Sequence, residues 1–129
     1  MNKQERIELA LEKHKSRHNC CQCSLAALGD LTGIDGGDLY KLGAGFAGGM
    51  GDANGVCGAL VGAVMALGGA TNAKGTVFKT RELLQKFKEK CGAIICRELK
   101  GIDTGKMLCS CDDCIANAVE AYCEVTGIE

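Results

Sequence analysis

Apolar residues recur along the chain every three or four positions, which is the spacing of amphipathic helices rather than of strands. The clearest stripe runs from Ile115 to Val125, near the C-terminus. Convincing alternation is missing, and the short segment 93–95 (AII) is the one strand candidate. The pattern therefore predicts an all-α fold: a single compact helical domain over 1–129, with about five to six helices and a Gly-rich central loop.

Capping residues and glycines indicate where these helices begin and end. Asn19 with Gln22, and Ser110 with Asp113, have the spacing of capping boxes. The expected helical segments are 4–17, 20–31 before Gly33, a short one capped by Asp38, 55–67 capped by Asn54 and stopped by Gly68 and Gly69, 81–91 capped by Thr80 and closed by Gly92, the turn 96–100 before Gly101, and 111–125. The glycine-rich segment 43–55 is expected to be a loop.

Two glycines in the central helix, Gly58 and Gly62, need an explanation. A glycine inside a helix costs up to about 1 kcal/mol relative to alanine. These two lie four residues apart, directly after Cys57. Their spacing indicates that another helix or loop approaches this face closely, which would bring other sulfur atoms to Cys57.

Composition and charge exclude several classes of partner. The chain has 129 residues, of which 24% are charged and 47% apolar, as in an ordinary soluble domain. A formal net charge of −1 argues against nucleic acid or an anionic membrane surface. The longest apolar run, 56–70, is shorter than the roughly 20 residues of a membrane span. The charged N-terminus has no apolar core of a signal peptide. We expect a cytoplasmic protein without membrane insertion, and Gly-rich helix faces would also suit a homodimer.

Cysteine is the exceptional residue, with ten in the chain. Without a secretion signal, such a content is more typical of metal binding or redox chemistry than of a disulfide scaffold. Four of the cysteines fall at predicted helix starts: Cys20, Cys57, Cys96 and Cys111. Because a helix N-terminus carries partial positive charge, we expect it to lower the pKa of each thiol and to favour the thiolate that binds metals and attacks disulfides.

The remaining cysteines divide into two kinds. CSCDDC (109–114) has the C-x-C-x-x-C spacing of a metal-binding segment, with Cys111 and Cys114 on one helix face. Cys91 and Cys123 are interpreted as spare core or surface thiols. No C-x-x-C is followed by His, so haem attachment is not expected. The G-x-G-x-x-G pattern at 43–48 has no preceding strand, so dinucleotide binding is not expected.

The segment GFAGGMGDANGVCGALVGAVMALGG resembles the signature of the C-GCAxxG-C-C family of redox-active proteins. The resemblance covers roughly 5–125, with Ala47 where the family usually has glycine. Its elements are Asn19-Cys20 with Leu25, Phe46 to Gly51, Cys57 to Gly62, Cys96 to Gly101, and a last cysteine that is either Cys111 or Cys114.

This resemblance implies a small helical protein with a redox function. A similar domain occurs in split-Soret-type cytochromes, where its cysteines are associated with an iron–sulfur site; this chain lacks the haem-binding part. The resemblance implies an iron–sulfur cluster, either [2Fe–2S] or [4Fe–4S], that serves in electron transfer or sensing. Its ligands would be Cys20, Cys57, Cys96 and either Cys111 or Cys114. The partner would be an electron donor or acceptor protein, or a small thiol.

Three alternatives stay open from the sequence. A metal-free thiol–disulfide oxidoreductase would use Cys57 as its attacking thiolate and Cys20 or Cys96 as the resolving thiol. A thiolate protein could bind zinc or a soft metal ion without redox turnover. A cysteine-rich helical interaction module would do neither. Only the oxidoreductase among these is an enzyme.

Overall fold

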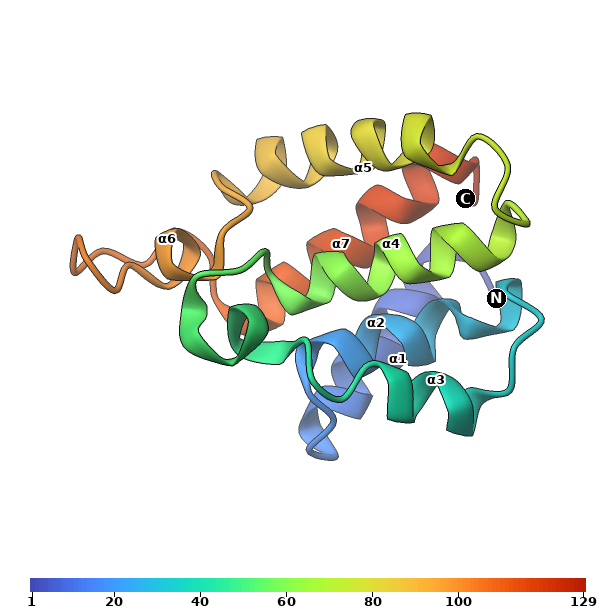
Figure 1. Cartoon of the computed structure of the whole chain (residues 1–129), viewed down its shortest axis with the longest axis horizontal. Coiled ribbons are helices and arrows are strands. Elements are labelled where there is room, and N and C mark those ends of the chain that lie inside the picture. Colours follow the sequence, from blue (N-terminus) through green and yellow to red (C-terminus); the bar gives the residue numbers. More distant parts are fainter.

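Helices α4 (Gly58–Ala70) and α7 (Cys111–Thr126) pack against each other, and the other long helices surround them (Figure 1). The structure is a computed structural model that describes residues 1–129. Helices α1 (Lys3–Lys15) and α2 (Cys20–Leu28) pack together on one side of this pair, and α5 (Thr76–Cys91) packs on the other. The short helices α3 (Gly36–Leu42) and α6 (Cys96–Lys100) lie at the periphery.

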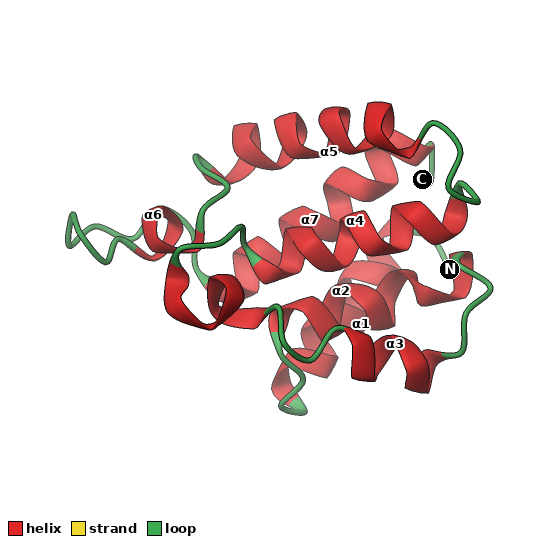
Figure 2. Ribbon diagram, in the orientation of Figure 1, coloured by secondary structure: helices red, strands yellow, loops and turns green.

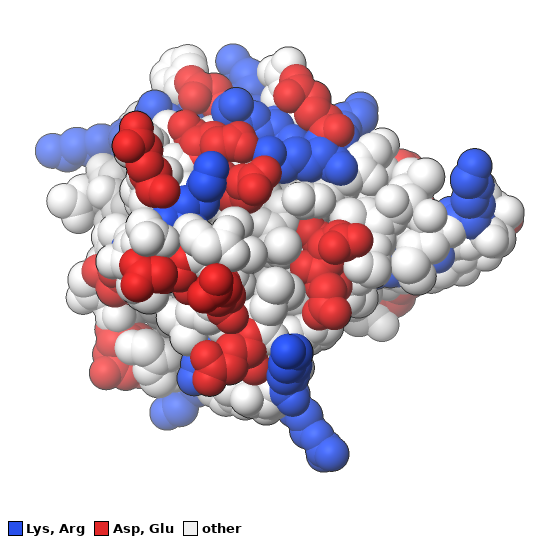
Figure 3. Space-filling model, turned by 180° about the vertical axis from the view of Figure 1, so that it is seen from behind, with Lys and Arg blue, Asp and Glu red and all other residues white.

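The predicted all-α class is confirmed. Seven α-helices are joined by two short helical turns, η1 (Gly29–Leu31) and η2 (Gly49–Ala53), and no strand is present (Figure 2). The strand candidate at 93–95 contributes only one isolated antiparallel bridge, between Ile95 and Val56. No helix is both long and apolar enough to cross a membrane. On the face shown in Figure 3, positive and negative side chains are intermixed, and the projecting end that carries α6 is largely uncharged.

Both predicted capping residues, Asn19 and Ser110, begin helices where the sequence placed them, but only Asn19 forms a reciprocal capping box. The Asn19 side chain accepts the N–H of Gln22, whose side chain returns to the Asn19 N–H. The Ser110 hydroxyl accepts the N–H of Asp113 at 3.1 Å. At the C-termini of α5 and α6, Gly92 and Gly101 adopt the positive φ that the sequence predicted for a helix-ending glycine.

Several predicted boundaries are wrong. Asp35 rather than Asp38 caps α3, because its carboxylate accepts the N–H groups of Gly37 and Asp38. Helix α5 begins four residues before Thr80, at Thr76. Helix α2 ends at Leu28, before the turn that leads to Gly33.

The central helix is also displaced from its predicted position. Asn54 does not cap it but accepts a hydrogen bond from Arg97 Nε, and Cys57 takes the cap position instead. Gly68 and Gly69 do not stop α4, which continues to Ala70. Gly69 lies so close to Thr32 that an added Cβ would be 2.7 Å from the Thr32 Cβ. Part of the predicted loop 43–55 forms the helical turn η2.

The close approach expected at Gly58 and Gly62 is present, and α2 makes it. A Cβ added at Gly58 would lie 2.5 Å from Cys20 Sγ, and one at Gly62 would lie 2.5 Å from the Cys21 carbonyl oxygen. The Ser24 hydroxyl donates a buried hydrogen bond of 2.8 Å to the Ala59 carbonyl in the same interface. These contacts fix α2 on α4 at a distance that only glycine permits.

We expect Gly62→Ala to lower the free energy of unfolding by about 1–3 kcal/mol, because the methyl group would overpack α2 against α4. The matched control is Gly68→Ala in the same helix, where an added Cβ meets nothing within 4 Å. That change should raise stability by up to about 1 kcal/mol through helix propensity. Urea unfolding measures the free energy of unfolding of both variants. Equal stabilisation by the two substitutions would contradict the observed interface.

One buried charge joins α1 to the end of α2. Arg6 is 3% exposed, and its guanidinium donates to the Ala27 carbonyl and to both carboxylate oxygens of Asp30, at 2.6 and 3.0 Å. The hydrogen bond from Arg6 lowers the pKa of Asp30 below its ordinary value of 3.8. Asp30 therefore stabilises the fold above that value, and the contribution is lost as the pH falls through the lowered pKa.

We expect the free energy of unfolding of the native chain to fall between about pH 5 and pH 3 more steeply than that of Asp30→Asn. At neutral pH the variant should be the less stable of the two, because it no longer offers Arg6 a charged partner. Urea unfolding across this pH range measures the difference. Glu89→Gln, at an exposed carboxylate without a hydrogen bond, is the control and should keep the native pH profile. Equal slopes for the native chain and Asp30→Asn would contradict the assignment.

Candidate metal centre

The starts of four helices and the end of a fifth meet at one end of the molecule, on the left in Figure 1. Cys20, Cys96 and Cys111 are the first residues of α2, α6 and α7, and Cys57 caps α4. All four cysteines thus occupy helix starts, as the sequence predicted. All ten cysteines of the chain are free thiols.

Backbone pairing explains why Cys57 and Cys96 come together. The Cys57 N–H donates to the Ile94 carbonyl at 2.8 Å, and the Cys96 N–H donates to the Gly55 carbonyl at 3.0 Å. These two bonds flank the Val56–Ile95 bridge and hold the start of α4 beside the start of α6. Gly49 closes this region from η2: its φ is +58°, and an added Cβ would lie 2.5 Å from Cys96 Cβ.

Burial and neighbouring cysteines raise the pKa of Cys20 and of Cys96. Burial raises the pKa of Cys20, and the neighbouring Cys57 and Cys111 raise it further. Burial also raises the pKa of Cys96, again with Cys57, Cys111 and Cys20 contributing, although the Lys100 cation opposes them. Cys20, Cys57, Cys96 and Cys111 make up the first group, in which no three sulfur atoms all lie within 4.8 Å of one another.

The expectation that helix starts lower the pKa of these thiols is wrong for Cys20, Cys57 and Cys96. Hydrogen bonding to Cys114 and burial raise the pKa of Cys57 well above its ordinary value, although backbone N–H groups of α4 act in the opposite direction. At these positions the free-energy cost of removing a thiolate from water is larger than the stabilisation that the helix N-terminus gives to that thiolate. The thiols of Cys20, Cys57 and Cys96 are therefore protonated at neutral pH.

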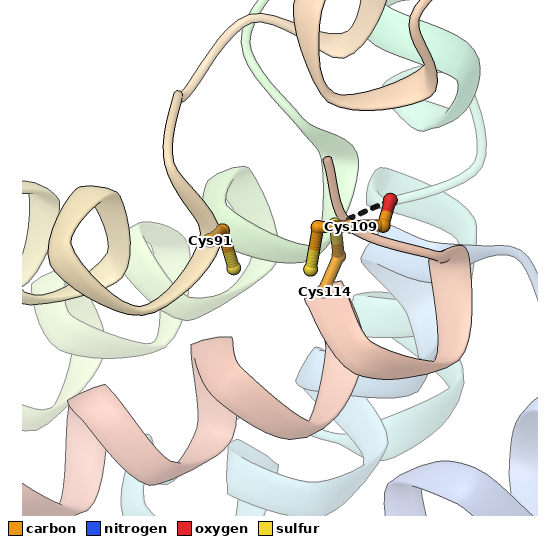
Figure 4. A group of neighbouring side chains, drawn as sticks. All are labelled: Cys91, Cys109 and Cys114. Carbon is orange, nitrogen blue, oxygen red and sulfur yellow. Dashed lines mark hydrogen bonds between the residues drawn. The ribbon is translucent and has the colours of Figure 1, made fainter. Parts of the chain in front are cut away.

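A second group of cysteines forms a tighter cluster beside the first (Figure 4). Its members are Cys91 at the end of α5, Cys109 in the segment before α7, and Cys114 in the first turn of α7. Their three sulfur atoms all lie within 4.8 Å of one another, and all three residues are buried. This arrangement could hold a metal ion.

Polar groups surround the second group. The Asn117 side-chain N–H₂ donates to Cys91 Sγ at 3.3 Å and reaches Cys109 Sγ at 3.9 Å. Lys100 Nζ donates to the Cys109 carbonyl at 3.1 Å and to Cys114 Sγ at 3.6 Å. Burial lowers the pKa of Lys100, but Cys114 and Cys111 raise it more, so Lys100 stays a cation.

Cys57 connects the two groups through Cys114. A hydrogen bond from Cys57 lowers the pKa of Cys114, but hydrogen bonding to Cys91, burial and Cys109 outweigh it, and the pKa is raised. Cys20 and Cys96 respond to Cys111, whereas Cys114 responds to Cys91 and Cys109.

The sequence interprets Cys91 as a spare core or surface thiol, and the structure places it in the core, 4% exposed, with its sulfur within 4.8 Å of the sulfurs of Cys109 and Cys114. The spacing in CSCDDC was the available signal for Cys109. Nothing local marks Cys91, because its position depends on α5 packing against α7. The other cysteines, Cys21, Cys23 and Cys123, are fully buried in the core. Burial raises the pKa of Cys21 and of Cys23 to about 12.

The fold and this cysteine-rich end define a small all-helical thiol protein with a possible metal site. Residues 18–125 match the sequence profile of the family described as "Putative redox-active protein (C_GCAxxG_C_C)". Since the match spans most of the chain, the protein belongs to this family, and the resemblance seen in its motifs is confirmed. No curated protein and no solved structure matches the chain.

Exposure within the cysteine-rich end predicts an order of thiol reactivity. Cys111 is exposed, Cys20 is half-buried, and the other eight cysteines are buried. A short pulse of iodoacetamide on the reduced, chelator-treated native protein should therefore modify Cys111 first, with Cys20 following more slowly. Peptide mass spectrometry identifies the modified residues.

Cys111→Ser should remove the fast reaction, and Cys123→Ser should retain it. Modification of Cys91, Cys109 or Cys114 ahead of Cys111 would contradict the packing described for the second group.

Proposed function

We propose that the protein transfers or senses electrons through an iron–sulfur cluster bound by Cys20, Cys57, Cys96 and Cys111. The observation that carries this proposal is the convergence of four thiols, from four separate helix starts, on one end of the fold. Cys20 and Cys96 each respond to the charges of Cys57 and Cys111. Membership of a family described as redox-active supports the same function.

The chemistry of these residues fits such a cluster. Four thiolates are the usual protein ligands of both [2Fe–2S] and [4Fe–4S] clusters. Helix starts also provide unpaired backbone N–H groups that can donate to sulfur. When bound, the cluster would supply one-electron oxidation and reduction. The exposed Cys111 and half-buried Cys20 would place it near the surface, where an electron donor or acceptor could approach.

Burial of protonated thiols is consistent with this function. A metal centre supplies the positive charge that makes thiolates stable in a buried site, and the thiol protons are released as it binds. Lys100 adds one cation beside Cys111 and Cys114. Cys20, Cys57 and Cys96 therefore need the positive charge of a metal centre, in addition to the helix starts, to become thiolates.

The same observations argue against the metal-free thiol–disulfide oxidoreductase. An attacking cysteine is usually accessible and has a lowered pKa. Cys57 is 5% exposed, and its pKa is raised by the hydrogen bond with Cys114 and by burial. In the metal-free protein Cys57 therefore lacks both properties of an attacking thiolate.

Anaerobic purification from iron-replete cells, or reconstitution with iron and sulfide, tests the proposal. We expect equal amounts of iron and labile sulfide, with charge-transfer absorption that reduction bleaches. Cys20→Ser and Cys96→Ser should each lose most of the bound iron. Cys123→Ser, which changes a buried thiol near Arg6, is the control and should retain it. Cys57 is unsuitable as the test position, because it belongs to the first group and also interacts with Cys114 of the second group.

A native chain that takes up no iron on reconstitution would refute the proposal. Full retention of iron by both Cys20→Ser and Cys96→Ser would refute the proposed ligands. Far-ultraviolet circular dichroism of each variant separates ligand loss from unfolding.

A further inference from the structure

The second cysteine group lies outside the proposed cluster ligands and needs its own explanation. Cys91, Cys109 and Cys114 are 4%, 7% and 1% exposed. They come from the end of one helix, a connecting segment and the start of another, so only the tertiary fold brings them together (Figure 4). Two of them, Cys91 and Cys109, correspond to no cysteine of the family motif.

We propose that Cys91, Cys109 and Cys114 form a separate zinc site. Zinc bonds to thiolate sulfur at about 2.3 Å, which places two sulfurs on one ion about 4 Å apart. The three sulfur atoms already lie within 4.8 Å of one another. Side-chain adjustments of less than about 1 Å would therefore bring them to zinc-binding distance.

The surroundings of the three sulfurs suit thiolates. Asn117 directs its N–H₂ group at Cys91 and Cys109, and Lys100 directs its ammonium group at Cys114. Each sulfur thus faces a hydrogen-bond donor, which is the usual role of the residues around a metal's ligands. We assign Asn117 to the surroundings of the site, because the group that it directs at the sulfurs is its N–H₂.

The charges of this site favour a divalent ion. Three thiolates carry three negative charges, zinc carries two positive charges, and the Lys100 ammonium carries one. The assembly is then neutral, which a buried site requires. Binding replaces three S–H bonds by three Zn–S bonds and releases three protons to solvent, without oxidation or reduction.

Zinc at this position would have a structural consequence. It would tie the end of α5 to the start of α7, beside the proposed cluster but independent of it. Three sulfurs leave one position of a tetrahedral zinc site. Cys57 contacts Cys114 and is therefore excluded from the variants that distinguish the two sites.

Metal analysis of anaerobically purified protein tests the proposal. Cells are grown with both iron and zinc, and both metals are measured per chain. We expect one zinc in the native chain, loss of that zinc in Cys91→Ser and Cys109→Ser, and retention of iron in both. Cys96→Ser should lose iron and retain zinc, and Cys123→Ser should keep both metals. Zinc retained at full occupancy in Cys91→Ser and Cys109→Ser would overturn the zinc site and leave the proposed cluster untouched.

A titration of the native chain needs no variant. Metal-free protein treated with Cd²⁺ should develop cadmium–thiolate absorption that saturates at two equivalents, one for each group of cysteines. Asn117→Leu removes a donor but no ligand, and should weaken zinc binding by about 10- to 100-fold. Saturation at a single equivalent of Cd²⁺ would overturn the proposal of a second site even if a cysteine variant failed to fold. So would an unchanged zinc affinity in a folded Asn117→Leu variant.

Discussion

The close approach of α2 to α4 is the constraint on which the cysteine-rich end depends. Gly58 and Gly62 leave no room for a Cβ between the helices, so Cys20 lies directly against the start of α4. Cys57 is the cap of that helix, and its backbone is paired with the segment that precedes Cys96. A larger residue at Gly58 would push Cys20 away from Cys57. The two glycines thus lower the helix propensity of α4, but they allow the close approach that places the sulfur atoms.

Burial determines what these sulfur atoms can do. A helix start stabilises a nearby thiolate, but only by about 0.3–1 kcal/mol at an ordinary exposed position. Removing an anion from water costs more than this, and other thiols nearby add to the cost. The raised pKa values of Cys20, Cys57 and Cys96 follow from that imbalance. A metal ion or cluster reverses it, because each metal charge acts on several sulfurs at once.

The sequence predicted features that depend on local chemistry. Neighbouring residues were enough to predict the helix caps at Asn19 and Ser110, the glycine ends of α5 and α6, and the tight helix contact at Gly58. Boundaries failed where tertiary contacts decide. Asn54 has a capping side chain, yet it binds Arg97, and the bridge at Val56 delays the start of α4. Cys91 resembles any other core thiol until α5 packs on α7.

Two metal sites at one end would not be independent in their electrostatics, because Cys57 and Lys100 lie between them. Cys57 is hydrogen-bonded to Cys114, and Lys100 interacts with both Cys111 and Cys114. Charge added to one group of sulfurs therefore changes the cost of charge on the other. Zinc bound by three thiolates would bring the second group and Lys100 to zero net charge, whereas three protonated thiols and Lys100 together carry one positive charge. If both proposed sites form, the second group would therefore act on the first through its charge, without supplying ligands to the proposed cluster.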